Sequence, residues 1–332
     1  MTVTVLGAGS WGTALSVLLA RNGQKVTLYG RGTGDVQSMR EHRRNARYLP
    51  EAVLDDSITV TDQPGDLSDS DLWVIATPSH AVHEAARLVT GASPQVVVAS
   101  KGLEERTART LADVALDLLP QADVGAFSGP NLAVEIERGI PTAAVAAFST
   151  LEAADRVREA FACRSFRIYL SQDIRGVELA GALKNVLAIG AGMGDGLGFG
   201  DNTKGALLAR GLHQMTSLGL AMGAKIETFL GVAGVGDLFA TAASRLSRNY
   251  RVGFAVGSGK SLPEALAEIG QVAEGVPTSG CAIQLAQRHS VSMSVFEGIH
   301  AVLHGEMEPL EAVTFLMDRI PRTEGLLADR TH

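Results

Sequence analysis

The chain has 332 residues, 46% of them hydrophobic, which is long for a single core and leads us to expect two domains. The formal net charge of −7 at pH 7 argues against a nucleic-acid partner, since such proteins present a positive field to the phosphate backbone. An acidic protein that binds an anion must therefore concentrate its positive charge locally. The 37 glycines and only 5% aromatic residues indicate close packing of backbone against backbone.

Cysteine and histidine usage narrows the class further. The two cysteines, Cys163 and Cys281, are isolated in the sequence and fit a reducing compartment. No spacing typical of metal ligands is present, and His80 and His83, one helical turn apart, are expected on a solvated helix face. Neither a charged and apolar leader nor an apolar stretch of about 18 residues is found, so no integral membrane segment is predicted. We expect a cytoplasmic protein without a metal site.

The chain opens with an expected strand, Thr2–Leu6, then a glycine loop, Gly7-Ala8-Gly9-Ser10-Trp11-Gly12, and an expected helix over residues 13–22. This order is typical of a dinucleotide site. The first glycine makes the tight turn, the second lets the backbone approach the pyrophosphate, and the third lets the helix pack on the strand. The helix N-terminus offers free N–H groups to the phosphates. A glycine-rich turn without a ligand is the alternative.

Up to about residue 170, short β runs alternate with helical segments, which predicts a doubly wound α/β sheet. Continuous apolar runs such as residues 72–76 are typical of buried parallel strands. Beyond Ser171 the strands stop and Ala/Leu/Gly-rich helical stretches follow, which predicts a separate all-α domain with Asp173 as its first N-cap. We predict a dinucleotide-binding domain over residues 1–172 and a helical, substrate-binding domain over residues 173–332. The other expected strands are Lys25–Tyr29, Ile58–Thr61, 96–100, 124–127, Thr142–Ala147 and 166–170.

Polar residues follow three of these strands, at the edge where open α/β sheets bind ligands. Lys101 can meet a phosphate or a carbonyl oxygen there, although an ordinary surface lysine is the alternative. Pro130 suits the first position of an expected helix that continues over residues 132–138, and its turn could offer N–H groups to an anion. The three segments are Thr77-Pro78-Ser79, Lys101-Gly102 and Ser128-Gly129-Pro130-Asn131.

Lys184 stands within residues 177–189, a helical stretch that is apolar nearly all round and is therefore predicted to be buried. A buried lysine must find a carboxylate, line a cavity or lose its proton. A desolvated lysine is suited to proton transfer at a carbonyl or an alcohol. The alternative is a structural ion pair with Glu178 or Asp237, or a side chain that reaches solvent.

Asp237 follows the glycine-rich residues 231–236 and precedes an expected helix over residues 238–246. It is either an N-cap or a functional carboxylate. Ser247-Arg248-Asn249 is expected at the other end of that helix, where its hydroxyl, guanidinium and amide suit a phosphate. An ordinary polar helix end is the alternative.

Taken together, these segments resemble the bacterial NAD(P)-dependent sn-glycerol-3-phosphate dehydrogenases, in order and over nearly the whole chain. The resemblance implies a Rossmann-type N-terminal domain and an all-helical C-terminal domain. It also implies interconversion of dihydroxyacetone phosphate and sn-glycerol 3-phosphate with NADP(H) and/or NAD(H), for glycerophospholipid synthesis. The partners would be small molecules, and the apolar content of the helical part is compatible with a homodimer. The matching motifs are Gly7–Gly12, Ser100–Glu104, Ser128–Glu135, Gly181–Val186, Gly236–Leu238, Ser247–Asn249 and Val272–Gly275.

The resemblance also assigns residues to roles. Lys184 would donate or accept the proton, and Lys101 would polarise the carbonyl or hold the neighbouring hydroxyl, with Asp237 as a further catalytic residue. Asn131 stands where the family often has Ser or Thr. Implied substrate contacts are Lys101, Gly129, Asn131, Lys184, Asp237, Ser247, Arg248 and Asn249. Cofactor contacts are expected from Gly7, Gly9, Ser10, Trp11, Gly12, Arg31, Lys101, Ala133, Arg248, Val272 and Glu274.

The end of the second strand bears on the choice of cofactor. Strand Lys25–Tyr29 is followed by Gly30-Arg31 rather than by the acidic residue that accepts from a ribose 2′-hydroxyl. Arg31 can pair with a 2′-phosphate, and Arg43 and Arg44 are candidates for additional charge. We therefore predict that NADPH is used at least as well as NADH.

Two other functions remain open. A β-hydroxyacid dehydrogenase would carry an asparagine one helical turn after its lysine, whereas here Ala188 holds that position and Asn185 is adjacent to Lys184. A 3-hydroxyacyl-CoA dehydrogenase would require a His–Glu pair, for which we find no motif. A dinucleotide sensor would keep the fold and lose the chemistry, and in such a protein the lysine would be expected to change.

Overall fold

The computed structural model describes residues 1–318 and divides into two compact units. Unit 1 comprises Met1–Lys101 and Leu111–Glu178, and unit 2 comprises Gly102–Thr110 and the chain from Leu179 onward. The excursion of residues 102–110 into unit 2 was not anticipated from the sequence. Residues 319–332, the end of the predicted helical domain, lie outside the described residues, and the boundary at 172/173 stays a prediction.

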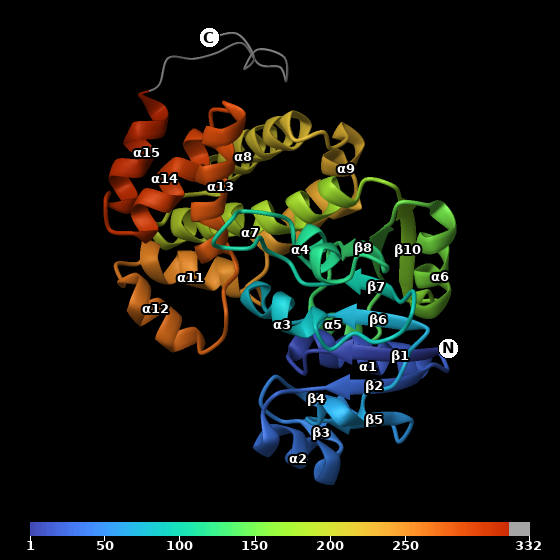
Figure 1. Ribbon diagram of the computed structural model, residues 1–332. Coiled ribbons are helices and arrows are strands. Elements are labelled where there is room, and N and C mark those ends of the chain that lie inside the picture. The colour runs from blue at the N-terminus through green and yellow to red at the C-terminus, as the bar shows by residue number, and fades with distance from the viewer. Residues whose placement is uncertain (319–332) are drawn as a thin grey trace. The chain divides into compact units, whose positions relative to one another are not determined.

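Unit 1 is built on an eight-stranded sheet with the order β10-β9-β8-β7-β6-β1-β2-β5 (Figure 1). The strand order reverses at β1, so the predicted doubly wound α/β sheet is confirmed. Four strands have their predicted bounds and the others differ by one or two residues at an end. The strands are β1 (Thr2–Leu6), β2 (Lys25–Tyr29), β5 (Ile58–Thr61), β6 (Leu72–Ile75), β7 (Gln95–Val98), β8 (Asp123–Ser128), β9 (Thr142–Ala147) and β10 (Phe166–Ser171).

Helices cover both faces of this sheet because neighbouring residues of a strand point to opposite sides. In β1, Val5 packs with Leu15 of α1 and Val157 of α6. The next residue, Leu6, packs with Val82 of α3 and Leu111 of α4 on the other face. The helices of unit 1 are α1 (Ser10–Arg21), α2 (Thr33–His42), α3 (Val82–Ala86), α4 (Leu111–Leu118), α5 (Ala133–Glu137) and α6 (Leu151–Phe161), with 3₁₀ turns at Pro64–Asp66 and Ser79–Ala81.

Strand β9 runs antiparallel to β8 and parallel to β10. The connection over residues 129–141 contains only the short helix α5, so β9 starts at the edge where β8 ends. Pro130 does not begin a helix as predicted, since α5 starts at Ala133 with Leu132 as its N-cap. The carbonyl of Pro130 instead accepts a hydrogen bond from Thr142 Oγ1 at 2.7 Å, which holds this loop against β9.

An antiparallel pair, β3 (Arg44–Asn45) with β4 (Leu49–Val53), was not predicted. Its buried Asn45 supports the glycine loop. The Asn45 amide donates to the carbonyl of Ala8 at 2.9 Å and to Thr13 Oγ1 at 2.8 Å. Strand β3 has only two residues and β4 contains a proline, so neither shows the alternation that marks a strand in a sequence.

The described part of unit 2 is helical apart from an isolated bridge between Leu103 and Thr110, so the predicted all-α domain is confirmed. Asp173 caps α7 as predicted, its Oδ1 accepting from the amide of Gly176 at 3.0 Å. None of the helices in residues 1–318 combines the length and apolar character of a membrane span. The helices are α7 (Ile174–Gly196), which starts in unit 1, α8 (Asp201–Ala221), α9 (Ile226–Leu230), α10 (Asp237–Ala242), α11 (Arg248–Gly257), α12 (Leu262–Ile269), α13 (Gly275–His289), α14 (Ser294–Leu303) and α15 (Pro309–Met317), with a π-helical turn at Val232–Gly236.

Helices α7 and α11 pack backbone against backbone through glycines on both sides. A Cβ added at Gly192 would lie 2.1 Å from the carbonyl oxygen of Tyr250, and one at Gly253 would lie 1.9 Å from that of Ile189. The same close approach recurs at Gly196 and Gly257. This contact brings the first turn of α11 beside the middle of α7.

Replacing Gly253 with alanine should destabilise unit 2, because the new methyl group forces α7 and α11 apart. We expect a loss of about 1–3 kcal/mol in the free energy of unfolding. Gly194→Ala in α7 is the matched control, since no described atom lies within 4 Å of its added Cβ. That change should stabilise by about 0.5–1 kcal/mol. Urea unfolding followed by circular dichroism measures both, and equal effects would contradict the contact.

Candidate active site

The glycine loop of unit 1 has a geometry that fits the roles predicted from the sequence. Gly7 has a φ of +117°, and a Cβ there would lie 2.8 Å from the carbonyl oxygen of Ala76. A Cβ at Gly12 would lie 1.9 Å from the carbonyl oxygen of Gly7, so α1 packs directly on the turn. Around Gly9, by contrast, no described atom lies within 4 Å of an added Cβ. The loop is therefore closed behind and open at Gly9, where a pyrophosphate must approach.

The start of α1 fits the same ligand. The helix begins at Ser10, earlier than predicted, so Ser10, Trp11 and Gly12 form its first turn. Gly9 is the N-cap and gives no side-chain cap to the first N–H groups, which suits phosphate oxygens. Trp11 Nε1 donates to the carbonyl of Ala99 at 2.9 Å, which fixes the indole beside the loop.

Arg31 follows β2 and forms an ion pair with Glu84 of α3. Gly30 packs closely on the glycine loop, since a Cβ there would lie 2.8 Å from Ala8 Cβ. Arg43 donates to the carbonyls of Leu54, Asp55 and Ile58, and Arg44 to those of Pro50 and Glu51. These two arginines hold the chain around β4, which accounts for them without a ligand.

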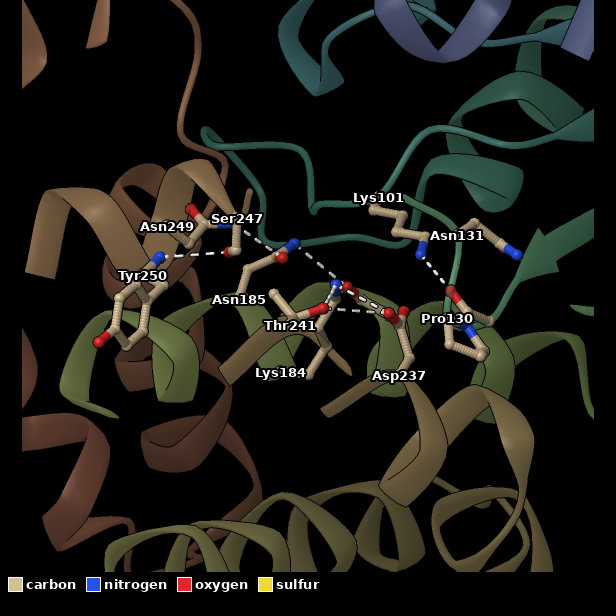
Figure 2. A network of polar contacts seen from close by, with 12 residues as sticks. Lys101, Pro130, Asn131, Lys184, Asn185, Asp237, Thr241, Ser247, Asn249 and Tyr250 are labelled. Atoms are coloured by element: carbon tan, nitrogen blue, oxygen red, sulfur yellow. Dashed lines mark hydrogen bonds and ion pairs between the residues drawn. The ribbon is translucent and has the colours of Figure 1, made fainter. Parts of the chain in front are cut away.

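At the ends of β7 and β8, Lys101 and the loop after Ser128 come together (Figure 2). Lys101 Nζ donates to the carbonyl of Gly129 at 2.6 Å. Gly129 has a φ of +152° and packs against β9, where a Cβ would lie 2.8 Å from the carbonyl oxygen of Ala143. Asn131 Nδ2 donates to that same carbonyl at 3.2 Å. The buried Asn131 Oδ1 has no hydrogen-bond partner among the described residues.

In unit 2, Lys184 finds a carboxylate, one of the outcomes that the sequence allowed. Its side chain lies within α7, 4% exposed, and Nζ is 3.0 Å from Asp237 Oδ1 (Figure 2). Nζ also donates to Thr241 Oγ1 at 2.5 Å, and the Thr241 hydroxyl donates to Asp237 Oδ1 at 3.2 Å. The other carboxylate considered, that of Glu178, accepts from the amide of Ala112 at 2.8 Å. The ammonium of Lys184 is thus held in a buried, hydrogen-bonded setting.

Asp237 is the first residue of α10 rather than its N-cap, which is Gly236. The preceding glycine-rich segment forms a π-helical turn, Val232–Gly236, packed on α9: a Cβ at Gly234 would lie 2.1 Å from the carbonyl oxygen of Phe229. Residues 194–196 likewise continue α7 instead of breaking it. Gly234 and Gly196 serve close helix packing, which glycine content alone does not distinguish from a loop.

The segment 247–249 begins α11 and does not end the preceding helix as predicted, because α10 stops at Ala242. Ser247 is the N-cap, and its Oγ accepts from the amide of Tyr250 at 3.2 Å (Figure 2). Arg248 lies in the first turn. Burial lowers the pKa of its guanidinium, and the nearby carboxylate of Glu274 raises it. Among the described residues the Arg248 guanidinium makes no hydrogen bond or close ion pair, so its N–H donors are available to an anion.

Asn249 is a bridge between three helices of unit 2. Its Nδ2 donates to Asn185 Oδ1 of α7 at 2.9 Å, and its Oδ1 accepts from the amide of Gly275 of α13 at 2.9 Å. Asn185 in turn donates to the carbonyl of Gly181 at 3.2 Å. The predicted substrate contact of Asn249 stays a prediction, and its buried amide already fixes α11 beside Lys184.

Comparisons with known proteins agree with this geometry. The model of the NAD-dependent glycerol-3-phosphate dehydrogenase N-terminus matches residues 2–154, and that of the C-terminus matches residues 173–314. The chain belongs to this dehydrogenase family. A glycerol-3-phosphate dehydrogenase [NAD(P)+] of a Thermoanaerobacter species is 44% identical, over 98% of this chain and 99% of the relative. The crystal structure of glycerol-3-phosphate dehydrogenase from Coxiella burnetii is 37% identical, with a TM-score of 0.92 over 96% of this chain and 99% of that one.

Three cofactor candidates remain to be placed, one in unit 1 and two in unit 2. Ala133 begins α5 in unit 1. In unit 2, Val272 is exposed, and Glu274 occupies the N-cap position of α13. The individual roles of the predicted site residues stay predictions, because membership of the family tests none of them.

Sequence reasoning missed three residues that hold the candidate regions, namely Asn45 in unit 1 and Asn185 and Thr241 in unit 2. Thr241 stands four residues after Asp237, and that spacing puts both side chains on one face of a helix. Asn185 is an amide inside an apolar helix, and such a group requires a partner. Those two signals were available. For Asn45, in a polar stretch without periodicity, there was none.

Breaking the Lys184–Asp237 ion pair should lower the free energy of unfolding. Asp237→Leu leaves a buried ammonium without its carboxylate, and we expect a loss of about 3–5 kcal/mol. The double variant Lys184→Met, Asp237→Leu removes both charges and should lose less than Asp237→Leu alone. Urea unfolding of the two single variants and the double variant gives the coupling energy. Simple addition of the two single effects would show that the side chains do not interact.

Proposed function

We propose that this chain reduces dihydroxyacetone phosphate to sn-glycerol 3-phosphate with NAD(P)H, and runs the reverse reaction, as the names of its relatives indicate for them. The observation that carries the proposal is the buried ammonium of Lys184, 3.0 Å from Asp237 Oδ1. It combines a transferable proton with a fixed position. The guanidinium of Arg248 in the same unit supplies a site for an anion.

A bound reduced nicotinamide supplies the hydride that C2 of the ketone receives. Lys184 then gives its proton to the oxygen at C2, which gains negative charge as the carbonyl is reduced; in the oxidative direction it takes that proton back. Asp237 and Thr241 hold the ammonium by accepting from it, and the Thr241 hydroxyl in turn donates to Asp237. A lysine suits this step because, unlike a guanidinium, its ammonium can surrender a proton near neutral pH.

The remaining residues orient the substrate. Arg248 would hold the phosphate through paired N–H donors, away from the reacting carbon. Lys101 would polarise the carbonyl or hold the neighbouring hydroxyl, and Asn131 Oδ1 would accept from a hydroxyl of the substrate. Binding energy gained at the phosphate can then fix the carbonyl for reaction.

We infer that the enzyme works in the cytoplasm and supplies glycerol 3-phosphate to glycerophospholipid synthesis. Its two cysteines, Cys163 and Cys281, are free thiols, which fits a reducing compartment. The assembly that we propose is a homodimer, because large apolar side chains of unit 2 such as Leu230 and Phe239 are 59% exposed. Sedimentation equilibrium measures that state directly.

The oxidation of NADPH and NADH, followed by absorbance, tests the function. We expect rapid oxidation with dihydroxyacetone phosphate and little with unphosphorylated dihydroxyacetone or with β-ketoacids. Turnover of a β-ketoacid instead would favour the β-hydroxyacid dehydrogenase alternative. Cofactor binding without turnover of any of these substrates would favour a dinucleotide sensor.

Lys184→Ala should reduce kcat by at least about 10²–10⁴-fold, the usual contribution of general acid–base catalysis. Lys184→Arg should restore little activity, because its guanidinium keeps its proton. Lys260→Ala, at an exposed lysine of the same unit, is the control and should keep wild-type kcat. Steady-state kinetics with circular dichroism on each variant measures the effect. A folded Lys184→Ala variant with near-normal kcat would overturn the assignment.

Arg248→Ala should lower kcat/KM for dihydroxyacetone phosphate by about 10- to 150-fold, corresponding to a charged hydrogen bond of about 1.5–3 kcal/mol. The loss should be much smaller for dihydroxyacetone, which has no phosphate to hold. Arg251→Ala, at an exposed arginine of the same helix, should change neither value. Equal losses on both substrates would show that Arg248 does not hold the phosphate.

A further inference from the structure

Arg31 and Glu84 connect two segments of unit 1 that are distant in sequence. Arg31 follows β2, and Glu84 lies in α3, the helix that follows β6. In the sheet, β1 lies between β2 and β6. The ion pair therefore links the two neighbours of β1 at the edge of the sheet where the glycine loop leaves it. A dinucleotide bound at that loop places its adenosine ribose near the end of β2.

The pair is weak enough to exchange for a ligand. The Arg31 side chain is 56% exposed and that of Glu84 is 66% exposed, and ion pairs of this kind contribute little because water screens them. A 2′-phosphate carries a charge of about −1.5 to −2 at neutral pH. It offers three acceptor oxygens to the same guanidinium, and so it competes favourably with one carboxylate.

Glu84 also brings a negative charge close to the end of β2, where the residue that follows the strand carries no charge. The residue after β2 is Gly30, where many NAD enzymes have an acidic side chain. The other nearby carboxylates have different partners: Asp35 pairs with Arg47 at 3.0 Å and Asp62 with Arg40 at 3.5 Å. Among the described residues, Glu84 is the carboxylate that pairs with Arg31. The ribose site thus contains a cation that suits a 2′-phosphate and an anion that opposes it.

We propose that Glu84 determines cofactor specificity by competing with the cofactor's 2′-phosphate for Arg31. NADPH must displace the carboxylate and then tolerate it nearby, whereas NADH has no 2′-phosphate and meets no such competition. The preference for NADPH is therefore lower than Arg31 alone would give. This inference rests on the proposed nicotinamide-dependent function and adds the residue that tunes its cofactor choice.

Isothermal titration with adenosine 2′,5′-bisphosphate and with adenosine 5′-monophosphate tests the proposal on the whole chain at one ionic strength. Glu84→Gln should tighten the bisphosphate by about 3- to 5-fold, the size of a surface ion pair. It should leave the monophosphate within about 2-fold. In steady-state assays the ratio of kcat/KM for NADPH to that for NADH should rise by the same factor. Glu41→Gln, which removes one charge from α2 without touching Arg31, is the matched control and should change neither.

The Arg31→Ala background separates competition from general repulsion. There, Glu84→Gln should change bisphosphate affinity by less than about 2-fold, because no guanidinium remains to be released. An unchanged affinity in the single Glu84→Gln variant, or equal gains for both nucleotides, would overturn the proposal. Equal gains in bisphosphate affinity with and without Arg31 would also overturn it, as would a wild-type protein that binds neither nucleotide. The expected binding pattern without turnover of dihydroxyacetone phosphate would support the role of Glu84 and reject the proposed function.

Discussion

A buried ammonium beside a buried carboxylate is the interaction around which α7 and α10 of unit 2 are arranged. Lys184 and Asp237 are 4% and 1% exposed, and either charge alone would be strongly unfavourable in such a setting. Thr241 adds a hydrogen bond to each member of the pair. The glycine contacts between α7 and α11, together with the hydrogen bond from Asn249 to Asn185, place the first turn of α11 beside the helix that carries Lys184. The ion pair and the close helix packing thus both depend on the position of α7.

The four basic side chains of the candidate regions each have a different environment. The Lys184 ammonium is paired and buried, which would suit the proton transfer that we propose for it. Arg248 is largely buried, and within residues 1–318 no side chain or carbonyl takes its hydrogen bonds, which suits a permanent anion site. Lys101 is oriented by the carbonyl of Gly129. Arg31 is exposed and paired with Glu84, so its partner can be exchanged for a ligand.

Local requirements made much of this fold predictable. Gly7, Gly9 and Gly12 differ in what surrounds them in the turn, and a carboxylate partner was one of the outcomes predicted for a lysine inside an apolar helix. What escaped prediction depends on contacts between distant segments. The reversal of β9 follows from a short connection, and Pro130 is kept out of α5 by Thr142, which stands on that strand. The break between α10 and α11, and the pairing of Arg31 with Glu84, likewise have no local signal.

The central claim is that the substrate carbon receives a hydride while Lys184 supplies the proton to its oxygen. The most direct measurement uses NADPH that carries deuterium at the transferable position of the nicotinamide, with dihydroxyacetone phosphate as substrate, and analyses the product by NMR and mass spectrometry. The account predicts a single deuterium at C2 of sn-glycerol 3-phosphate and none at C1 or C3. Deuterium at another carbon, or a product without deuterium, would contradict it.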